Sequence, residues 1–251
     1  MHSPKVETTQ DAFLKNGLPF IKSIQKIDCK KSTIDGVSFI SPTPNELEKL
    51  TFYLAIQIEE YEKKLQSSRK FNHPFSFQRI IAVGTGGYTF AKKLKEHLHL
   101  PLSVLEARSY KGLKRASKVG ITLSLSNSII GEHVLLLDEV NDKGETLKGV
   151  KAYVKAMGPK SITTATLFYK PKSKTKSDIY AYETSSWIIF PHETSEFIEE
   201  RYEAWKKTYT VAKMYSLLVD KIGLPKEEVS YYLTRAIQNE HKEAANHKKK
   251  S

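Results

Sequence analysis

The sequence predicts an α/β fold, with a mainly parallel sheet flanked by helices and a helical extension at its C-terminal end. Short apolar runs typical of buried strands alternate with helical patterns up to about residue 190. Two of these runs lead into glycine-containing turns, and from about residue 196 the apolar residues recur only at helical spacing. Because ligands of such sheets bind at the carboxyl ends of the strands, we expect both turns on one side of the sheet.

The overall composition is that of a globular protein with an excess of positive charge. The chain has 251 residues, of which 39% are hydrophobic, enough for a sizeable core and against wholesale disorder. The formal net charge of +12 favours anionic partners, although it also serves solubility. Cys29 is the single cysteine, which excludes an internal disulfide. No apolar run is long enough to span a bilayer and the N-terminus lacks a hydrophobic signal core, so we expect a cytoplasmic protein without membrane partners.

The first predicted helix has a clear start. Residues 1–42 show no strong pattern, although Gly36–Pro42 is compatible with a short strand. At Thr43–Glu46, the threonine can cap, the proline suits the first helical position and the glutamate completes a capping box. Leucines and other apolar residues then recur at helical spacing to about Gln66.

Strands and helices alternate along the middle of the chain. The apolar runs predict strands at Arg79–Val83, Leu102–Ala107, Val119–Leu125, Val134–Leu137, Ile162–Tyr169 and Trp187–Phe190. Helical patterns occupy Tyr88–Leu98 and Leu147–Met157, and Gly158-Pro159 stops the second. A turn over Gly84–Gly87 joins the first of these strands to its helix.

The C-terminal part reads as helices only. Three apolar stripes lie at helical spacing: Phe197, Ile198, Tyr202 and Trp205; Val211, Met214, Leu218 and Ile222; Val229, Tyr232, Leu233 and Ile237. The polar, lysine-rich tail over 241–251 is expected to be disordered. We therefore expect an N-terminal segment of unassigned role over 1–42, a domain over 43–194 and a helical extension over 195–240.

The segment Val134–Leu147, VLLLDEVNDKGETL, predicts a phosphate site. Asp138 and Glu139 follow a buried strand, where carboxylates suit sugar hydroxyls or hydrated Mg²⁺. The chain then enters a helix whose unpaired N–H groups and dipole favour an anion. Gly144 permits close approach of the backbone, and Thr146 offers a hydroxyl donor. An ordinary βα turn with solvated acids is the alternative.

The order of these residues resembles the phosphoribosyl-pyrophosphate (PRPP) motif of type I phosphoribosyltransferases. That motif is a hydrophobic strand, two acids, a hydrophobe, one residue, and then typically Asp-Thr-Gly-x-Thr. The resemblance implies PRPP and phosphate binding by Asp138, Glu139, Asp142, Lys143, Gly144, Glu145 and Thr146. Lys143 stands where the family usually has threonine, so that a point charge replaces a hydroxyl donor. Glu145 adds a negative charge that is unfavourable beside phosphate.

The resemblance extends over roughly Ile80–Glu193. Thr85, Gly86 and Gly87 look like the pyrophosphate loop of the family, whereas a dinucleotide-binding pattern fails because no third glycine follows at the required spacing. Ser109, Tyr110 and Lys111 resemble the mobile loop that closes over the site and excludes water.

The end of the predicted domain resembles the 6-oxopurine branch, above all the xanthine–guanine enzymes. The resemblance implies base binding by Lys170, Trp187 and Ile188, and Mg²⁺ binding by Glu193 together with Asp138 and Glu139. Lys170 would donate to the purine 6-oxo group and Trp187 would stack on the base. A core tryptophan and a solvated loop lysine are the alternatives for these two residues. His192 replaces the more usual tryptophan, which leaves the choice of base open.

The function implied by the resemblance is transfer of ribose-5-phosphate from PRPP to guanine, xanthine or hypoxanthine. The products would be a nucleoside monophosphate and pyrophosphate, with Mg²⁺ as cofactor. Asp142 matches the family's base near purine N7 and is the expected catalytic residue. The family is commonly dimeric or tetrameric, so a homodimer or homotetramer is expected.

Two other functions stay open. A non-catalytic sensor of PRPP or a nucleotide would have the same fold, and Lys143 and Glu145 speak for it. Leu217–Leu233 resembles a helix-turn-helix, which would imply a nucleic-acid partner. Most of the excess positive charge precedes residue 195, so nucleic-acid binding is the least favoured of the three.

Overall fold

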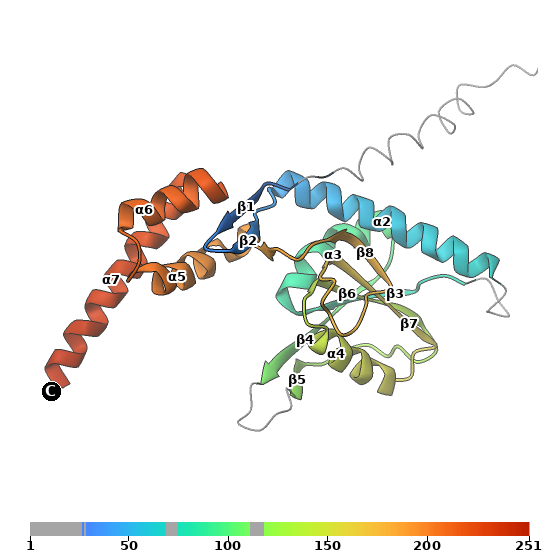
Figure 1. Ribbon diagram of the computed structural model, residues 1–251. Helices are drawn as coiled ribbons and strands as arrows, with labels where there is room; N and C mark the ends of the chain where they lie inside the picture. Colours follow the sequence, from blue (N-terminus) through green and yellow to red (C-terminus); the bar gives the residue numbers. More distant parts are fainter. Residues whose placement is uncertain (1–26, 28, 69–74, 111–117, 251) are drawn as a thin grey trace, which may run out of the picture. The chain divides into compact units, whose positions relative to one another are not determined.

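The computed structural model describes residues 27, 29–68, 75–110 and 118–250, and these form two compact units (Figure 1). The first unit contains the described residues of Glu48–Ser185 together with Ile27. The second contains those of Asp28–Leu47 and Ser186–Ser251. Residues 186–194, which the sequence assigned to the central domain, therefore group with the C-terminal helices.

A six-stranded sheet forms the centre of the first unit. Its strands are β3 (Arg79–Val83), β4 (Leu102–Tyr110), β5 (Lys118–Leu123), β6 (His133–Asn141), β7 (Ser161–Tyr169) and β8 (Ile179–Glu183). The order is β5-β4-β3-β6-β7-β8, and every neighbouring pair is parallel except β4 and β5. This arrangement confirms the predicted α/β fold with a mainly parallel sheet.

Helices α2 (Pro44–Ser67), α3 (Gly84–Leu98) and α4 (Glu145–Ala156) complete the strand–helix pattern. The predicted capping box is present at the start of α2, where Glu46 N donates to Thr43 Oγ1 over 3.2 Å and Thr43 N donates to Glu46 Oε2 over 2.6 Å. Buried side chains of α4 pack in one cluster with Val134 and Leu136 of β6. Because these two residues alternate along the strand, they identify the face of the sheet that α4 covers.

Three local expectations differ from the structure. The predicted turn Gly84–Gly87 is the first turn of α3, since Gly84 at φ +63° lets the chain pass directly from β3 into the helix. Strand β6 continues to Asn141 instead of ending at Leu137, because β7 pairs with it as far as Tyr169. Strand β8 was not predicted, since its sequence IYAYE is short and follows a lysine-rich loop.

The second unit combines a small sheet with the C-terminal helices. Strands β1 (Lys31–Ile34), β2 (Val37–Ile40) and β9 (Trp187–Ile188) lie in the order β1-β2-β9. After them come the 3-10 turn η1 (Pro191–Glu193), α5 (Thr194–Trp205), α6 (Val211–Ser216), the π-helical η2 (Leu217–Ile222) and α7 (Lys226–Lys250). Residues of all three predicted apolar stripes form its core, including Phe197, Met214 and Leu233. The helical extension expected from the sequence is therefore present.

Helix α7 also includes residues expected to be disordered. The sequence predicted no regular structure over 241–251, whereas α7 continues to Lys250. The segment after Glu240 contains alanine, glutamate and lysine but no glycine or proline, so nothing in it breaks the helix. No helix in the described part of the chain is long and apolar enough to cross a membrane.

Candidate active site

The candidate site begins where α3 packs against the end of β6. Strands β3 and β6 are parallel neighbours, so the segments that follow them emerge at the same edge of the sheet, as predicted. A Cβ on Gly87 would lie 2.8 Å from the Leu137 carbonyl oxygen, and one on Gly86 would overlap the Glu139 carboxylate. Only residues without side chains let the start of α3 come this close to β6.

The acidic pair lies within β6 and not in the turn after it. Asp138 and Glu139 are half-buried and, as consecutive strand residues, they point to opposite faces of the sheet. The Glu139 backbone N–H donates to Asp138 Oδ1 over 2.8 Å. Burial raises the pKa of Asp138 to about 7, the charge of Glu139 adds to this rise, and the backbone hydrogen bond opposes it. Hydroxyl donors or a cation bound here would stabilise the ionised carboxylate.

Gly144 shapes the loop between β6 and α4. It is the N-cap of α4 at φ +78°, a conformation that other residues rarely adopt. The sequence predicted that Gly144 leaves room for a ligand near the backbone. In the structure, the position of a Cβ is already crowded, with Ser173 Oγ at 2.6 Å and Thr175 N at 2.9 Å. The close approach at Gly144 is therefore made by the loop 171–178.

The residues of the phosphate loop differ in exposure. Asp142 and Lys143 are exposed, whereas Glu145 and Thr146 are half-buried. Lys174 Nζ lies 3.1 Å from Glu145 Oε1, so a cation compensates the negative charge that the sequence places in this loop. The N–H groups of the first turn of α4 remain at the carboxyl edge of the sheet, where they can bind an anion.

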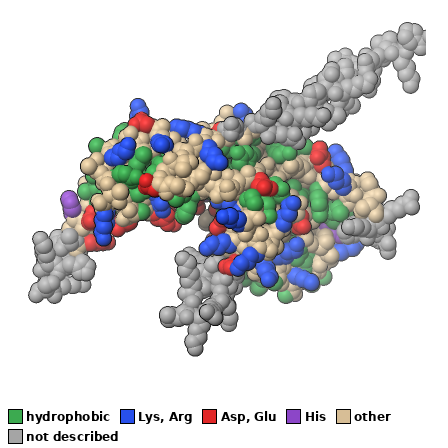
Figure 2. Space-filling model, in the orientation of Figure 1, with side chains coloured by type: hydrophobic (Ala, Val, Ile, Leu, Met, Phe, Trp, Pro, Cys, Tyr) green, Lys and Arg blue, Asp and Glu red, His purple; other side chains and the backbone are tan. Residues whose placement is uncertain are grey.

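Lys170 begins the loop that follows β7. Its backbone N–H donates to the Asn141 carbonyl over 3.0 Å, which places it next to the phosphate loop. Burial lowers the pKa of the half-buried Lys170 ammonium, while the negative charge of Asp142 acts in the opposite direction. Lys172 and Lys176 of the same loop are exposed, and Figure 2 shows Lys and Arg side chains on the surface of the first unit.

Two of the three residues predicted for the mobile loop belong to a strand. Ser109 and Tyr110 end β4, and their backbones lie in register with Val119 and Lys118 of β5. Lys111 lies outside the described residues. The structure thus places this segment on a hairpin at one edge of the sheet.

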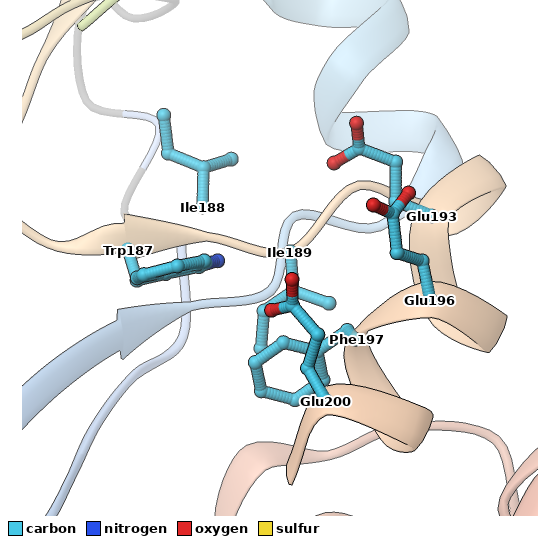
Figure 3. Close-up of a pocket in the computed structure, with 7 residues that line it drawn as sticks. All are labelled: Trp187, Ile188, Ile189, Glu193, Glu196, Phe197 and Glu200. Atoms are coloured by element: carbon cyan, nitrogen blue, oxygen red, sulfur yellow. The ribbon is translucent and has the colours of Figure 1, made fainter. Parts of the chain in front are cut away.

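A pocket in the second unit holds the other predicted residues (Figure 3). It is lined by Trp187, Ile188, Ile189, Glu193, Glu196, Phe197 and Glu200. The side chain of Trp187 is 47% exposed, which is unlike a core tryptophan; Trp205, at 6%, fills that role. The carboxylates of the three glutamates make the pocket acidic, and β9 and α5 supply most of its walls.

Arg201 supports the tryptophan in this pocket. Its guanidinium carbon lies 5.5 Å from the centre of the Trp187 ring and 5.6 Å from that of Phe197. Arg201 Nη2 also lies 3.8 Å from Glu200 Oε2. A cation stacked on an aromatic ring restricts its rotation, so Trp187 is held in an exposed position.

Each unit thus carries part of the predicted site. The first unit brings together the Thr85–Gly87 segment, the Asp138–Thr146 segment and Lys170, and the second brings together Trp187, Ile188 and Glu193. Sequence reasoning missed the residues that support them: Asn141, Ser173, Lys174, Glu196, Glu200 and Arg201. Asn141 could have been noticed, because an asparagine at the end of a buried strand needs polar partners.

Comparison with known proteins identifies relatives for the part of the chain that carries these residues. The pattern of the phosphoribosyl transferase domain matches residues 50–197. The hypoxanthine phosphoribosyltransferase of Haemophilus influenzae is 29% identical over 110 residues, which cover 42% of this chain and 62% of that protein. The hypoxanthine-guanine phosphoribosyltransferase of Streptococcus pneumoniae R6 is 27% identical over 121 residues, covering 47% and 67%. The matches thus span about two thirds or less of these relatives' lengths.

A solved structure agrees with the sequence comparison. The purine phosphoribosyltransferase of Pyrococcus horikoshii superposes with a TM-score of 0.52 at 30% identity. The superposition covers 61% of this chain and 92% of the archaeal one. The family pattern ends at residue 197, so α6, η2 and α7 lie beyond it.

Proposed function

The chain belongs to the phosphoribosyltransferase family, and from this premise we propose that it transfers ribose-5-phosphate from PRPP to a 6-oxopurine. The products are a nucleoside monophosphate and pyrophosphate. The observation that carries the proposal is the convergence of the acidic pair, the starts of α3 and α4, and Lys170 at one edge of the sheet. The three relatives described above are named as purine phosphoribosyltransferases, which supports a purine as the base.

PRPP is held by three elements of the first unit in this proposal. One carboxylate of the pair Asp138 and Glu139 binds the ribose hydroxyls, because the two side chains point to opposite faces of β6. The loop Asp142–Thr146 binds the 5-phosphate through N–H groups at the start of α4. Thr85–Gly87 binds the pyrophosphate. Lys143 contributes a charge where the family pattern has a hydroxyl, and Lys174 offsets the charge of Glu145.

The base is recognised by Lys170 together with Trp187 and Ile188. The Lys170 ammonium is a donor without acceptor capacity, which suits a purine 6-oxo group and discriminates against a 6-amino group. The exposed face of Trp187 offers a stacking surface for the purine ring. Half-burial of Lys170 strengthens its hydrogen bond, because few waters compete for the donor.

Magnesium is the proposed cofactor, and its expected ligands are Glu193 and the acidic pair Asp138 and Glu139. Their carboxylate oxygens are the ligand type that Mg²⁺ prefers, which supports the choice of ion. When bound, the ion neutralises charge on the pyrophosphate. The protein's own side chains orient that ion and the ribose.

Asp142 handles the proton in the proposed reaction. The bond between C1′ and the pyrophosphate oxygen breaks, and a bond forms between C1′ and a ring nitrogen of the base. Asp142 accepts the proton that the base loses, and its exposure and its electrostatic influence on Lys170 support this role. Ser109, Tyr110 and Lys111 exclude water from the reacting centre during this step.

The remaining parts of the proposal concern organisation. We propose 43–194 as the extent of the catalytic domain, although 43–47 and 186–194 group with the second unit, and 195–240 as a helical extension. We expect a homodimer or homotetramer. Light scattering after gel filtration tests the assembly, with a monomer as the contrary result.

A panel of bases tests the activity. The protein is incubated with PRPP, Mg²⁺ and guanine, xanthine, hypoxanthine or adenine, and pyrophosphate release is followed. Release with at least one 6-oxopurine and none with adenine is the expected result. Tight PRPP binding without release from any base would instead indicate the sensing protein that Lys143 and Glu145 suggest.

A further inference from the structure

Asn141 stands at the centre of a buried hydrogen-bond network beside the phosphate loop. It ends β6 and is only 1% exposed. Its Nδ2 donates to the Thr175 carbonyl over 2.6 Å and to Ser177 Oγ over 2.9 Å. Ser173 Oγ lies 2.9 Å from Asn141 Oδ1, so both ends of the amide are engaged. All three partners belong to the segment Ser173–Ser177, which we call the brace.

The brace contacts the phosphate loop at three further points. Lys174 N donates to the Lys143 carbonyl over 3.2 Å, and Lys174 Nζ pairs with Glu145. Ser173 and Thr175 crowd the side of Gly144 where a Cβ would sit. Asn141 and three residues of the phosphate loop, Lys143, Gly144 and Glu145, thus contact the same short segment.

Asn141 also connects this loop to the predicted base-binding lysine. Its carbonyl accepts the backbone N–H of Lys170, the residue that leads from β7 into the brace. One asparagine therefore holds the chain entering the brace through its backbone and the brace itself through its side chain. The phosphate loop leaves from the same residue.

The buried amide of Asn141 is better suited to fixing one conformation than to stabilising the fold. A buried amide is costly unless every donor and acceptor is paired, so a polar network of this kind stabilises one geometry more than it stabilises the fold. An apolar residue at the end of a buried strand would need no such partners. The network fixes the position of the phosphate loop relative to Lys170. Their separation would decide whether a phosphate and a base can be bound at the same time.

We infer that Asn141 is a positioning residue, which sets the phosphate loop Asp142–Thr146 against Lys170 through the brace. This inference rests on the proposed function for its catalytic consequence, but not for its structural one. Displacements of about 1 Å in such supports can reduce turnover roughly a hundredfold. We therefore expect changes at Asn141 to affect PRPP binding and turnover although the side chain is turned into the protein.

Two variants and a matched control test the inference. Asn141→Asp preserves size but loses both N–H donors and faces the Thr175 carbonyl with an acceptor. Ser173→Ala removes the hydroxyl on the other side of the network, on a half-buried loop where misfolding is not expected. Thr163→Val is the control, because Thr163 is also a buried residue of β7 and its hydroxyl is hydrogen-bonded to Tyr61, outside the brace.

Hydrogen exchange gives the first readout and does not depend on catalysis. Amides of residues 142–146 should exchange about tenfold faster in Asn141→Asp and Ser173→Ala, because the loop opens more often without the brace. In Thr163→Val they should change no more than amides of β3. Equal exchange in all three variants and the wild type overturns the inference.

Kinetics give the second readout and separate positioning from mere stability. The KM for PRPP should rise about tenfold in Asn141→Asp and in Ser173→Ala. The KM for the base should change less than about threefold in both variants. A lowered melting temperature with unchanged KM values would show that Asn141 is structural only. A wild type without turnover would refute the proposed function, while the exchange result would still decide the role of Asn141.

Discussion

Lys174 compensates Glu145 across the first turn of α4, with 3.1 Å between Nζ and Oε1. The two residues lie 29 positions apart in the sequence, so this relationship becomes visible only in the fold. It offsets the negative charge of the acid in the loop that we propose to bind phosphate. The pair is largely exposed, which limits its strength to the range of a surface ion pair.

Removing the cation of this pair should weaken PRPP binding moderately. In Lys174→Met the negative charge of Glu145 is uncompensated beside the phosphate, and we expect the KM for PRPP to rise about threefold at low salt. The double variant Lys174→Met/Glu145→Gln should recover most of the loss. The measurement is the KM for PRPP in all four proteins of this cycle; a double variant no better than the single one would contradict the compensation.

Asp142 should matter for turnover more than for binding. Asp142→Asn keeps the size of the side chain but removes the proton acceptor, and we expect kcat to fall by about 10²–10⁴. The dissociation constant for PRPP should change less than about threefold, because the loop still offers its backbone N–H groups. Calorimetry and initial rates on the same preparation measure both quantities. Unchanged turnover would refute the assignment.

The buried carboxyl group of Asp138 should make the unliganded protein less stable at higher pH. Folding raises the pKa of Asp138 from 3.8 to about 7, so the folded state binds a proton more readily than the unfolded state does. Stability therefore decreases as the pH rises through the window from about 4 to about 7, and is lowest above it. Asp138→Asn should raise the melting temperature at pH 8 more than at pH 5. The exposed Asp142→Asn serves as a control, and an equal effect of Asp138→Asn at both pH values would contradict this account.

Gly144 should tolerate a methyl group poorly for two separate reasons. Alanine at φ +78° is strained, and its Cβ would also meet Ser173 and Thr175. Gly131 offers a matched control, because it has φ +75° but no atom within 4 Å of a Cβ. Urea unfolding should show that Gly144→Ala costs at least about 1 kcal/mol more than Gly131→Ala. Equal losses would mean that the crowding by the brace has no energetic weight.

Most strands and helices between α2 and β7 were predictable because local signals marked them. The run Val134–Leu137 is apolar throughout and becomes a central parallel strand, and the capping residues at Thr43–Glu46 mark the start of α2. The turn Gly84–Gly87 was misread because glycine usually interrupts a helix. Here it opens one, since α3 must pass close to β6.

The supports of the candidate site could not be predicted in the same way. Asn141 and Ser173 lie 32 residues apart, and Trp187 and Arg201 belong to a strand and a helix of the second unit. Sequence motifs indicated candidate site residues because these follow strands in a recognisable order. The residues that support them do so through contacts between distant segments, which no local pattern encodes.

Formation of a nucleoside monophosphate tests the central claim most directly. The protein is mixed with PRPP, Mg²⁺ and each 6-oxopurine, and both products are quantified by chromatography. We expect nucleoside monophosphate and pyrophosphate in equal amounts with at least one base, and neither product from the Asp138→Asn/Glu139→Gln double variant. Absence of nucleoside monophosphate with guanine, xanthine and hypoxanthine alike would contradict the proposed activity.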